Sequence, residues 1–383
     1  MHICFLTPEY PHPDIGKSGG LGTSIKNLAT QLVKEGVTVT VVVCGQKQDA
    51  VFMEDHITFH VIKQRAYSLF GFYRYRKFLE TYLNRLCRSE HIDLVEAPDW
   101  TGITAFMQLQ VPLVIRFNGS DAYFCKLDGR PQKKKNYFFE KWALQGADHL
   151  LSVSQFTAAE TRALFDLKKE ITVIPNSIDI HRFEPQPEKE QADRVLYFGT
   201  IIRKKGVLEL VSIYNLVHAA HPETQFIFAG KDVVDVFTGT STKAMILEGL
   251  DDAVKEKVHF LEELPYTAIQ EEIAKATVVV LPSFAEAMPM TWLEAMAMEK
   301  ALVTSDIGWA KELMIDGETG YTVHPKDHQR YADKIGALLK DSNLRKSLGV
   351  LARKRVAEHF STKVITRKNS DFYKSIVNNQ DKS

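Results

Sequence analysis

The sequence predicts an α/β protein of two domains, each built around a parallel sheet. Its 383 residues suffice for two domains of ordinary size. Short runs rich in β-branched residues alternate with helical patterns, which is typical of parallel strands that are buried on both faces. A polar stretch with two prolines at 184–193 indicates a linker. We therefore expect an N-terminal domain over 1–185, a second domain over 186–362 and a last helix within 363–383.

The first domain opens with a strand–helix–strand unit. Residues 3–7 and 37–44 have the composition of strands, and the helical periodicity of 24–35 stops at Gly36. Further elements are expected as strands at 92–97, 111–117, 149–154 and 171–175, and as a helix at 156–165. In open α/β sheets, ligands bind outside the carboxyl ends of such strands.

The second domain repeats this opening, with a strand at 194–199 and a helix at 207–218. The remaining elements are expected as strands at 224–230, 258–261, 277–282 and 301–304, and as helices at 329–339, 343–359 and 363–377.

One segment of the second domain, 281–297, combines a strand end, a loop and a helix start. Pro289 suits the first helical position, because its missing N–H costs nothing there and its fixed φ fits. A helix from Pro289 to about Glu299 would direct the free N–H groups of Met290 and Thr291 beyond the strand. This layout predicts a site for a diphosphate.

A glutamate stands on either side of this helix start. Glu294 shares a helix face with Met290 and Thr291, and helical side chains lean toward the N-terminus, so its carboxylate could reach a ribose beside the diphosphate. Glu286 lies in the loop, where a carboxylate could accept hydrogen bonds from sugar hydroxyls.

Two glutamates with seven residues between them are weak evidence alone, but longer motifs surround them. The segment 282–297 is PSFAEAMPMTWLEAMA, followed by ALVTSD from Ala301 and DGETGY from Asp316. Together these resemble the retaining, nucleotide-sugar-dependent glycosyltransferases of family 4. The resemblance implies the GT-B fold, in which two Rossmann-like domains with parallel sheets face an interdomain cleft and the last helix crosses back to the first domain.

The resemblance also implies roles for residues of this segment. Glu286 would contact the donor sugar and Glu294 the ribose. The other donor contacts expected here are Met288, Pro289, Met290 and Thr291.

Two further loops match the same family. Residues 17–22, KSGGLG, resemble its glycine-rich loop, which closes over the donor diphosphate, so Gly19 and Gly20 are expected at the donor. The family's phosphate-binding lysine, just before a glycine, corresponds to Lys205. Relatives often have Arg where Thr200 stands, and we expect Arg203 to supply that charge.

Asn118 stands where many family members have a histidine that contacts the donor sugar. An amide excludes proton handling by this side chain but keeps hydrogen bonding to a hydroxyl. Arg116 and Asp121 lie close to it in sequence and are candidates for acceptor contacts. For each of them, a structural salt bridge or a turn cap is the alternative.

By resemblance, a sugar passes from a nucleoside diphosphate sugar to an acceptor hydroxyl with retention of configuration, the acceptor being a glycan, a polysaccharide or a lipid-linked sugar. Lys205, Arg203 and Glu286 are the expected catalytic residues, with the cations stabilising negative charge on the leaving phosphate. We expect front-face attack, with a donor phosphate oxygen accepting the proton. The sequence shows no Asp-x-Asp pair at a strand end and no histidine cluster, which favours an enzyme without a metal or other cofactor.

Two other functions fit the same fold. One is a nucleotide-sugar epimerase, which needs no acceptor, or a sugar phosphorylase, which needs inorganic phosphate and no nucleotide. The other is a non-catalytic sugar-nucleotide-binding protein, suggested by Asn118 and Thr200, which would bind nucleotide without turnover.

The composition narrows the partners. A formal charge of zero argues against a nucleic-acid binder that relies on a bulk electrostatic field. The four cysteines lack CxxC spacing, so neither a disulfide framework nor a zinc site is expected. The chain starts directly in a strand, and no apolar run approaches the roughly 20 residues that span a bilayer, so a cytoplasmic protein is expected.

Residues 67–88 mix aromatic side chains with many arginines and few acids. Such a helix fits peripheral contact with an anionic membrane or a charged acceptor. The alternative is a surface helix whose Phe and Tyr pack inward while Arg and Lys extend along the surface. Residues 133–139, KKKNYFF, leave the same two alternatives open.

Overall fold

The structure is a computed structural model that describes residues 1–16 and 18–380. The chain divides into two compact units: unit 1 comprises Met1–Ser177 and the segment from Thr362, and unit 2 comprises Ile178–Ser361. The division precedes residue 185, where we expected it, because the residues after Ser177 are tied to unit 2. The Ile178 N–H donates to the Phe360 carbonyl at 2.9 Å, and the buried Phe183 accepts from Arg353 Nη1 at 2.8 Å.

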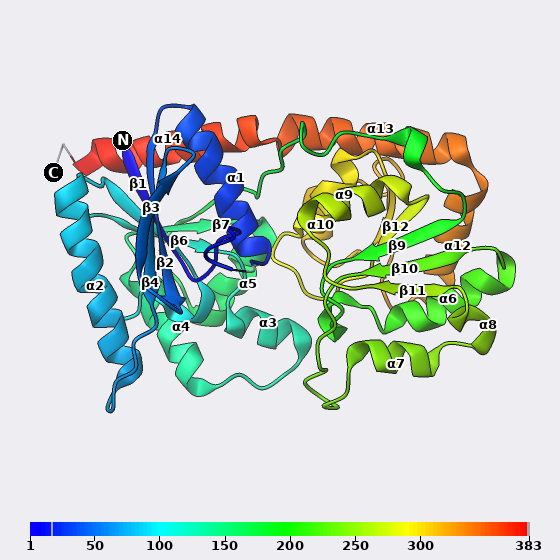
Figure 1. Ribbon diagram of the computed structural model, residues 1–383, viewed down its shortest axis with the longest axis horizontal. Coiled ribbons are helices and arrows are strands. Elements are labelled where there is room, and N and C mark those ends of the chain that lie inside the picture. The colour runs from blue at the N-terminus through cyan, green and yellow to red at the C-terminus, as the bar shows by residue number, and fades with distance from the viewer. Residues whose placement is uncertain (17, 381–383) are drawn as a thin grey trace. The chain divides into compact units, whose positions relative to one another are not determined.

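Unit 1 is built on an eight-stranded sheet in the order β3-β4-β2-β1-β5-β6-β7-β8 (Figure 1). Neighbouring strands are parallel except β3 and β4, which form an antiparallel hairpin. The strands are β1 His2–Thr7, β2 Thr38–Gln46, β3 Ala50–Glu54, β4 Ile57–Lys63, β5 Leu94–Pro98, β6 Leu113–Phe117, β7 His149–Ser152 and β8 Ile171–Val173. The helices are α1 Gly20–Lys34, α2 Gly71–Glu90, η1 Trp100–Gly102, α3 Asp121–Asp128, α4 Lys134–Gly146, α5 Gln155–Phe165 and α14 Thr362–Gln380.

Helices cover both faces of this sheet, as the apolar strands require. Successive side chains of β1 point to opposite faces. Ile3 and Phe5 pack in the core under α1 and α14, whereas Cys4 and Leu6 pack in the core under α2 and α4. Figure 1 shows α1 and α2 on opposite sides of the sheet.

Unit 2 is a six-stranded parallel sheet in the order β11-β10-β9-β12-β13-β14. The strands are β9 Arg194–Phe198, β10 Gln225–Ala229, β11 Val258–Leu261, β12 Val278–Leu281, β13 Ala301–Thr304 and β14 Tyr321–Thr322. The helices are η2 Pro187–Lys189, η3 Arg203–Lys205, α6 Glu209–Ala220, α7 Thr242–Gly249, α8 Asp252–Lys255, α9 Tyr266–Lys275, α10 Met290–Ala297, α11 Ala310–Leu313, α12 His328–Lys340 and α13 Ser342–His359. The carboxyl ends of the adjacent strands β9 and β12 therefore lie at the same edge of the sheet.

No helix in the described part of the chain is both long and apolar enough to cross a membrane.

Candidate functional site

In unit 2, the loop after β9 and the segment after β12 are joined by backbone contacts. The Lys204 carbonyl accepts N–H groups from Phe284 at 2.8 Å and Ala285 at 3.3 Å. Gly206 has φ +71°, and a Cβ on it would lie 1.9 Å from the Pro282 carbonyl oxygen. Only glycine permits this approach. These contacts fix Lys205 beside the segment that contains Glu286.

Lys205 and Glu286 form an ion pair. The Lys205 ammonium contacts Glu286 Oε1, and the Ser283 hydroxyl donates to the same oxygen at 2.9 Å. The side chains are only 20% and 10% exposed. Both residues are expected at the donor from the sequence, but their contact and the hydrogen bond from Ser283 are not predictable from it. The ion pair holds the Lys205 ammonium in a defined, partly desolvated position, where it can also bind a second anion besides the Glu286 carboxylate.

Helix α10 starts one residue later than expected. Pro289 has φ −73° and ψ 119°. Because this ψ is extended and not helical, Pro289 is the N-cap and Met290 is the first helical residue. The helix ends at Ala297, and Glu299 has a positive φ of 57°, so it does not reach Glu299. The first N–H groups of α10 still lack intrahelical acceptors.

The start of α10 lies beside the end of β9. A Cβ built on Gly199, which follows β9, would lie 3.8 Å from Thr291 Cγ2. Thr291 is half-buried, whereas Met288, Met290 and Glu294 are buried. The positive end of α10, the loop with Lys205 and the Glu286 carboxylate thus share the carboxyl edge of the unit 2 sheet.

Arg203 lies in the same loop but is bound to a carboxylate that the sequence analysis missed. Its Nε and Nη2 donate to the two oxygens of Asp235 at 2.7 and 2.9 Å. Asp235 is buried and also accepts from the Thr238 N–H and hydroxyl, both at 3.0 Å. The hydrogen bond from Arg203 lowers the pKa of Asp235 to about 2. Asp235 lies in an irregular stretch without a pattern that could have pointed to it.

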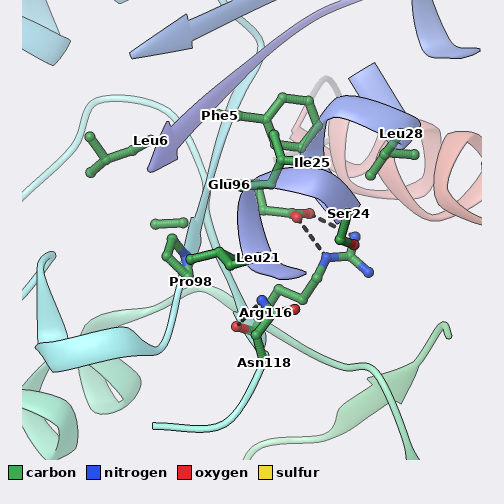
Figure 2. A pocket seen from close by; sticks show the side chains of 11 residues that line it. Phe5, Leu6, Leu21, Ser24, Ile25, Leu28, Glu96, Pro98, Arg116 and Asn118 are labelled. Atoms are coloured by element: carbon green, nitrogen blue, oxygen red, sulfur yellow. Dashed lines mark hydrogen bonds and ion pairs between the residues drawn. The ribbon is translucent and has the colours of Figure 1, made fainter. Parts of the chain in front are cut away.

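In unit 1, Asn118 follows the carboxyl end of β6. Its N–H donates to Asp99 Oδ1 at 3.0 Å, and its amide nitrogen donates to the Arg116 carbonyl at 3.3 Å. Asn118 and Arg116 line a small cavity of about 10 Å³ with Glu96, Pro98 and residues of α1 (Figure 2). This is room for about one water molecule.

Arg116 is a structural residue, and the expectation of an acceptor contact is corrected. It is buried and binds Glu96 through two hydrogen bonds of 2.7 and 3.0 Å, drawn as dashed lines in Figure 2. Its Nη2 also donates to Asn369 Oδ1 at 2.6 Å and contacts the Tyr373 hydroxyl at 3.2 Å. The guanidinium is therefore fully engaged between β5 and α14.

Asp121 is the first residue of α3 and is half-buried. Its carboxylate accepts from Arg130 Nη2 at 3.2 Å and from Asn136 Nδ2 at 3.1 Å. It thus joins the start of α3 to the loop before α4 and to the first turn of α4. These contacts correspond to the structural salt bridge that was the alternative to an acceptor contact.

The glycine-rich loop leads into α1, with Gly19 as N-cap and Gly20 as first helical residue. The N–H groups of Gly19 and Gly22 donate to Glu9 Oε1 at 3.1 and 2.9 Å. The N–H of Gly19, a residue expected at the donor, therefore binds a carboxylate of the chain itself. Lys17, part of the predicted motif, lies outside the described residues.

Asp99, directly after β5, is a buried carboxyl that the sequence analysis did not single out. Burial raises its pKa to about 8, although the Asn118 N–H, which favours the ionised form, opposes this shift. Its Oδ2 has no hydrogen-bond partner among the described residues. Its position at a strand end was the only signal in the sequence.

Over residues 1–16 and 18–380, no group of three or more His, Cys, Asp or Glu side chains has the geometry of a metal site.

Comparison with known proteins agrees with this architecture. The family described as glycosyl transferases group 1 matches residues 179–355, and glycosyltransferase family 4 matches residues 18–182. The chain is 26% identical to a glycogen synthase of Mycobacterium tuberculosis, covering 97% of this chain and 94% of the relative. It is also 26% identical to an alpha-maltose-1-phosphate synthase of Mycolicibacterium smegmatis, covering 98% and 100%.

Solved structures show the same fold. Sucrose-phosphate synthase from Thermosynechococcus elongatus superposes with a TM-score of 0.80 at 19% identity and covers 98% of both chains. HepE from Anabaena, solved with UDP and glucose, superposes with a TM-score of 0.75 at 18% identity, covering 98% of this chain and 100% of the other.

Proposed function

The chain belongs to the family 4 glycosyltransferases of the GT-B fold, and we propose how its two units divide the work of sugar transfer. It is an enzyme that transfers a sugar from a nucleoside diphosphate sugar to an acceptor hydroxyl. In our proposal unit 2 binds the donor, unit 1 supplies groups that bind the acceptor, and the configuration at the anomeric carbon is retained. The anomeric proton coupling of the product, measured by NMR, tests retention.

One observation carries the assignment of the donor to unit 2: a partly buried ammonium lies at the sheet edge that also holds the start of a helix. Lys205 and the first N–H groups of α10 are suited to the oxygens of a diphosphate. Glu294, in the same helix and buried, would accept from the ribose. Arg203, fixed by Asp235, adds a positive charge close to Lys205 along the chain.

In the proposed step, the bond from the anomeric carbon to the leaving phosphate oxygen breaks as the acceptor oxygen bonds to the same face of that carbon. The acceptor proton passes to a donor phosphate oxygen, so no protein base is needed. Negative charge grows on the diphosphate, and Lys205 stabilises it more in the transition state than in the ground state. Glu286 would then accept hydrogen bonds from the sugar hydroxyls.

On unit 1, Asn118 and Asp121 remain candidates for hydrogen bonds to the donor sugar and the acceptor, respectively. Both lie at or just after the carboxyl end of β6, the edge at which open α/β sheets bind ligands. We propose a carbohydrate acceptor, either free or lipid-linked. Arg116 is not part of this proposal, because its guanidinium is engaged inside unit 1.

Release of nucleoside diphosphate from a panel of UDP-, GDP-, ADP- and TDP-sugars tests this function. We expect slow hydrolysis of one donor, lost in Glu286→Ala and kept in Glu256→Ala, which removes an exposed glutamate of unit 2. No turnover with any donor, with and without carbohydrate acceptors, would contradict the proposal and favour a non-catalytic sugar-nucleotide-binding protein.

We further propose that the reaction needs no metal ion and no other cofactor, because fixed cations and helix N–H groups take the stabilising role. Turnover with the active donor should be unchanged after dialysis against EDTA. Loss of turnover that Mg²⁺ or Mn²⁺ restores would contradict this.

A further inference from the structure

Large apolar side chains are exposed around the first turns of α2 and α4 in unit 1. Leu69 and Phe70 are 68% and 70% exposed, Tyr73 is 43%, Phe138 is 47% and Trp142 is 44% exposed. Together with Phe72, which is 37% exposed, these residues are here called the aromatic patch. So many exposed aromatic residues on one surface indicate an interaction site.

The patch is continuous across the two helices. The Phe72 ring lies 5.0 Å from that of Phe139 in α4, and Lys135 lies 4.5 Å above the Phe72 ring. Tyr73 and Trp142 both pack on Phe106, at 5.4 and 4.9 Å between ring centroids. These contacts make one surface from segments far apart in the sequence.

Positive charge surrounds the patch. Neither 64–79 nor 129–139 contains Asp or Glu, and Arg74, Lys133, Lys134 and Lys135 are exposed. The acids next to these two segments are paired or buried. Asp128 pairs with Arg130 at 3.2 Å. Glu80 pairs with Lys77, and Glu140 is buried, where it accepts the N–H groups of Asp121 and Ala122.

The patch belongs to the same sheet edge as Asn118. Helix α2 follows β4, so it starts at the carboxyl edge of the sheet. Arg76, in its second turn, donates to the carbonyls of Gly102 and Thr101, both at 3.0 Å, in the loop after β5. The rest of α2 packs into the core through Leu79, Leu83 and Leu86. The exposed aromatic residues of 67–88 therefore lie at the start of the helix, beside those of α4, whose segment 133–139 left the same two alternatives open.

We propose that the aromatic patch and lysines 133–135 dock unit 1 on the surface of an anionic lipid bilayer. Aromatic side chains and leucine enter the interfacial layer, and lysines are attracted by anionic headgroups; stable anchoring needs two such signals. A neutral glycan has no negative charge that could pair with the lysines. The side chains of Leu69 and Phe70 have no polar group that could hydrogen-bond to a glycan. The consequence that a lipid-linked acceptor reaches unit 1 from this surface rests on the proposed function, whereas docking itself does not.

Sedimentation of the purified full chain with lipid vesicles tests the docking. We expect binding to vesicles of phosphatidylcholine with phosphatidylglycerol, weak binding to phosphatidylcholine alone, and weakening by salt. Lys133→Gln/Lys134→Gln/Lys135→Gln should reduce the partition coefficient on the order of a hundred-fold, at about fivefold for each charge. Leu69→Ser/Phe70→Ser should reduce it by roughly tenfold or more for each side chain.

Matched control variants remove exposed apolar side chains and exposed lysines from other parts of the surface. Val51→Ser/Met53→Ser alters two side chains of β3 that are 63% and 69% exposed. Lys340→Gln/Lys346→Gln/Lys354→Gln removes three exposed lysines from α12 and α13 of unit 2. Both controls should bind like the wild type. Equal binding by all variants, an equal loss in the controls, or equal wild-type binding to neutral vesicles would overturn the proposal.

Donor hydrolysis, measured without vesicles for every variant, separates this proposal from the proposed function. The patch variants should hydrolyse the donor like the wild type, which also shows that they fold. A protein that binds anionic vesicles but hydrolyses no donor would contradict the proposed function and leave docking supported.

Discussion

Lys205 is the residue on which the proposed chemistry depends most. Its replacement by alanine should lower kcat by about a hundred- to a thousandfold, the effect typical of removing one fixed donor from a developing negative charge. Steady-state kinetics with the active donor measure this, with Lys243→Ala, an exposed lysine of unit 2, as control. Near-normal turnover in Lys205→Ala would disprove the assigned role.

The ion pair with Glu286 calls for a second comparison. Lys205→Ala also removes a partner of a buried carboxylate, which could disturb the site indirectly. The double variant Lys205→Ala/Glu286→Gln has no such charge. We expect the double variant to turn over more slowly than Glu286→Gln alone; equal turnover in these two variants would mean that Lys205 serves only to neutralise Glu286.

The raised pKa of Asp99 predicts that the free energy of unfolding decreases as pH rises. Its pKa is about 8 in the folded protein against an ordinary value of 3.8, so the folded state binds one more proton between these values. Its contribution to stability therefore falls by about 1.4 kcal/mol per pH unit as pH rises through this window. Asp99→Asn should remove this dependence.

Urea unfolding at pH 5.5 and 7.5 checks this prediction. Between these two values the unfolding free energy of the wild type should fall by roughly 2–3 kcal/mol more than that of Asp99→Asn. Identical pH dependence in both proteins would show that the buried carboxyl is ionised in the folded state.

Motifs in the sequence predict Lys205 and Glu286 as site residues but do not predict the partners of the proposed site residues. Asp235 binds Arg203, and Glu9 binds the glycine-rich loop. No local sequence pattern predicts these contacts, because the partners are separated along the chain. Arg116 is a candidate from the sequence because it lies close to Asn118. It is structural because Asn369, 253 positions further along, lies against it.

At the scale of elements, the loop between β9 and α6 is fixed against the end of β12 by Gly206. Alanine at this position would combine a positive φ with a clash against the Pro282 carbonyl. Gly206→Ala should therefore destabilise unit 2 and lower turnover by displacing Lys205. Gly239→Ala is the matched control, because Gly239 has φ +72° and nothing within 4 Å of the new Cβ, so that only backbone strain of about 1–2 kcal/mol remains.

Thermal unfolding and turnover of the two alanine variants make this comparison. A larger loss of both in Gly206→Ala supports the fixed loop. Equal small losses would mean that the loop can move away from Pro282 without consequence.

Buried parallel strands were predictable because their apolar runs are short and continuous, as in β12 and β13. The β3–β4 hairpin was not assigned, since Asp55 and His56 make its turn with positive φ instead of a glycine. Helix α10 was expected with Pro289 as its first residue. The proline ring fixes only the φ angle. The ψ angle of the same residue decides whether the helix includes that residue.

At the scale of the whole molecule, the two α/β sheets followed from composition and alternation, and the GT-B fold from the resemblance to family 4. Unit 2 begins at Ile178, before the stretch 184–193 whose prolines predict the linker, because Ile178 pairs with Phe360 far along the chain. The aromatic patch could not be located from sequence, because it combines the first turns of α2 and α4, which only the fold brings together.

Titration of the protein with the nucleoside diphosphate of its active donor, the matching monophosphate and the nucleoside tests most directly whether unit 2 binds the donor. We expect the diphosphate to bind more tightly than the monophosphate, and Lys205→Ala to weaken diphosphate binding by about ten- to a hundredfold while leaving nucleoside binding unaffected. Equal affinities of wild type and Lys205→Ala for the diphosphate would contradict the proposal that this loop of unit 2 binds the donor's phosphates.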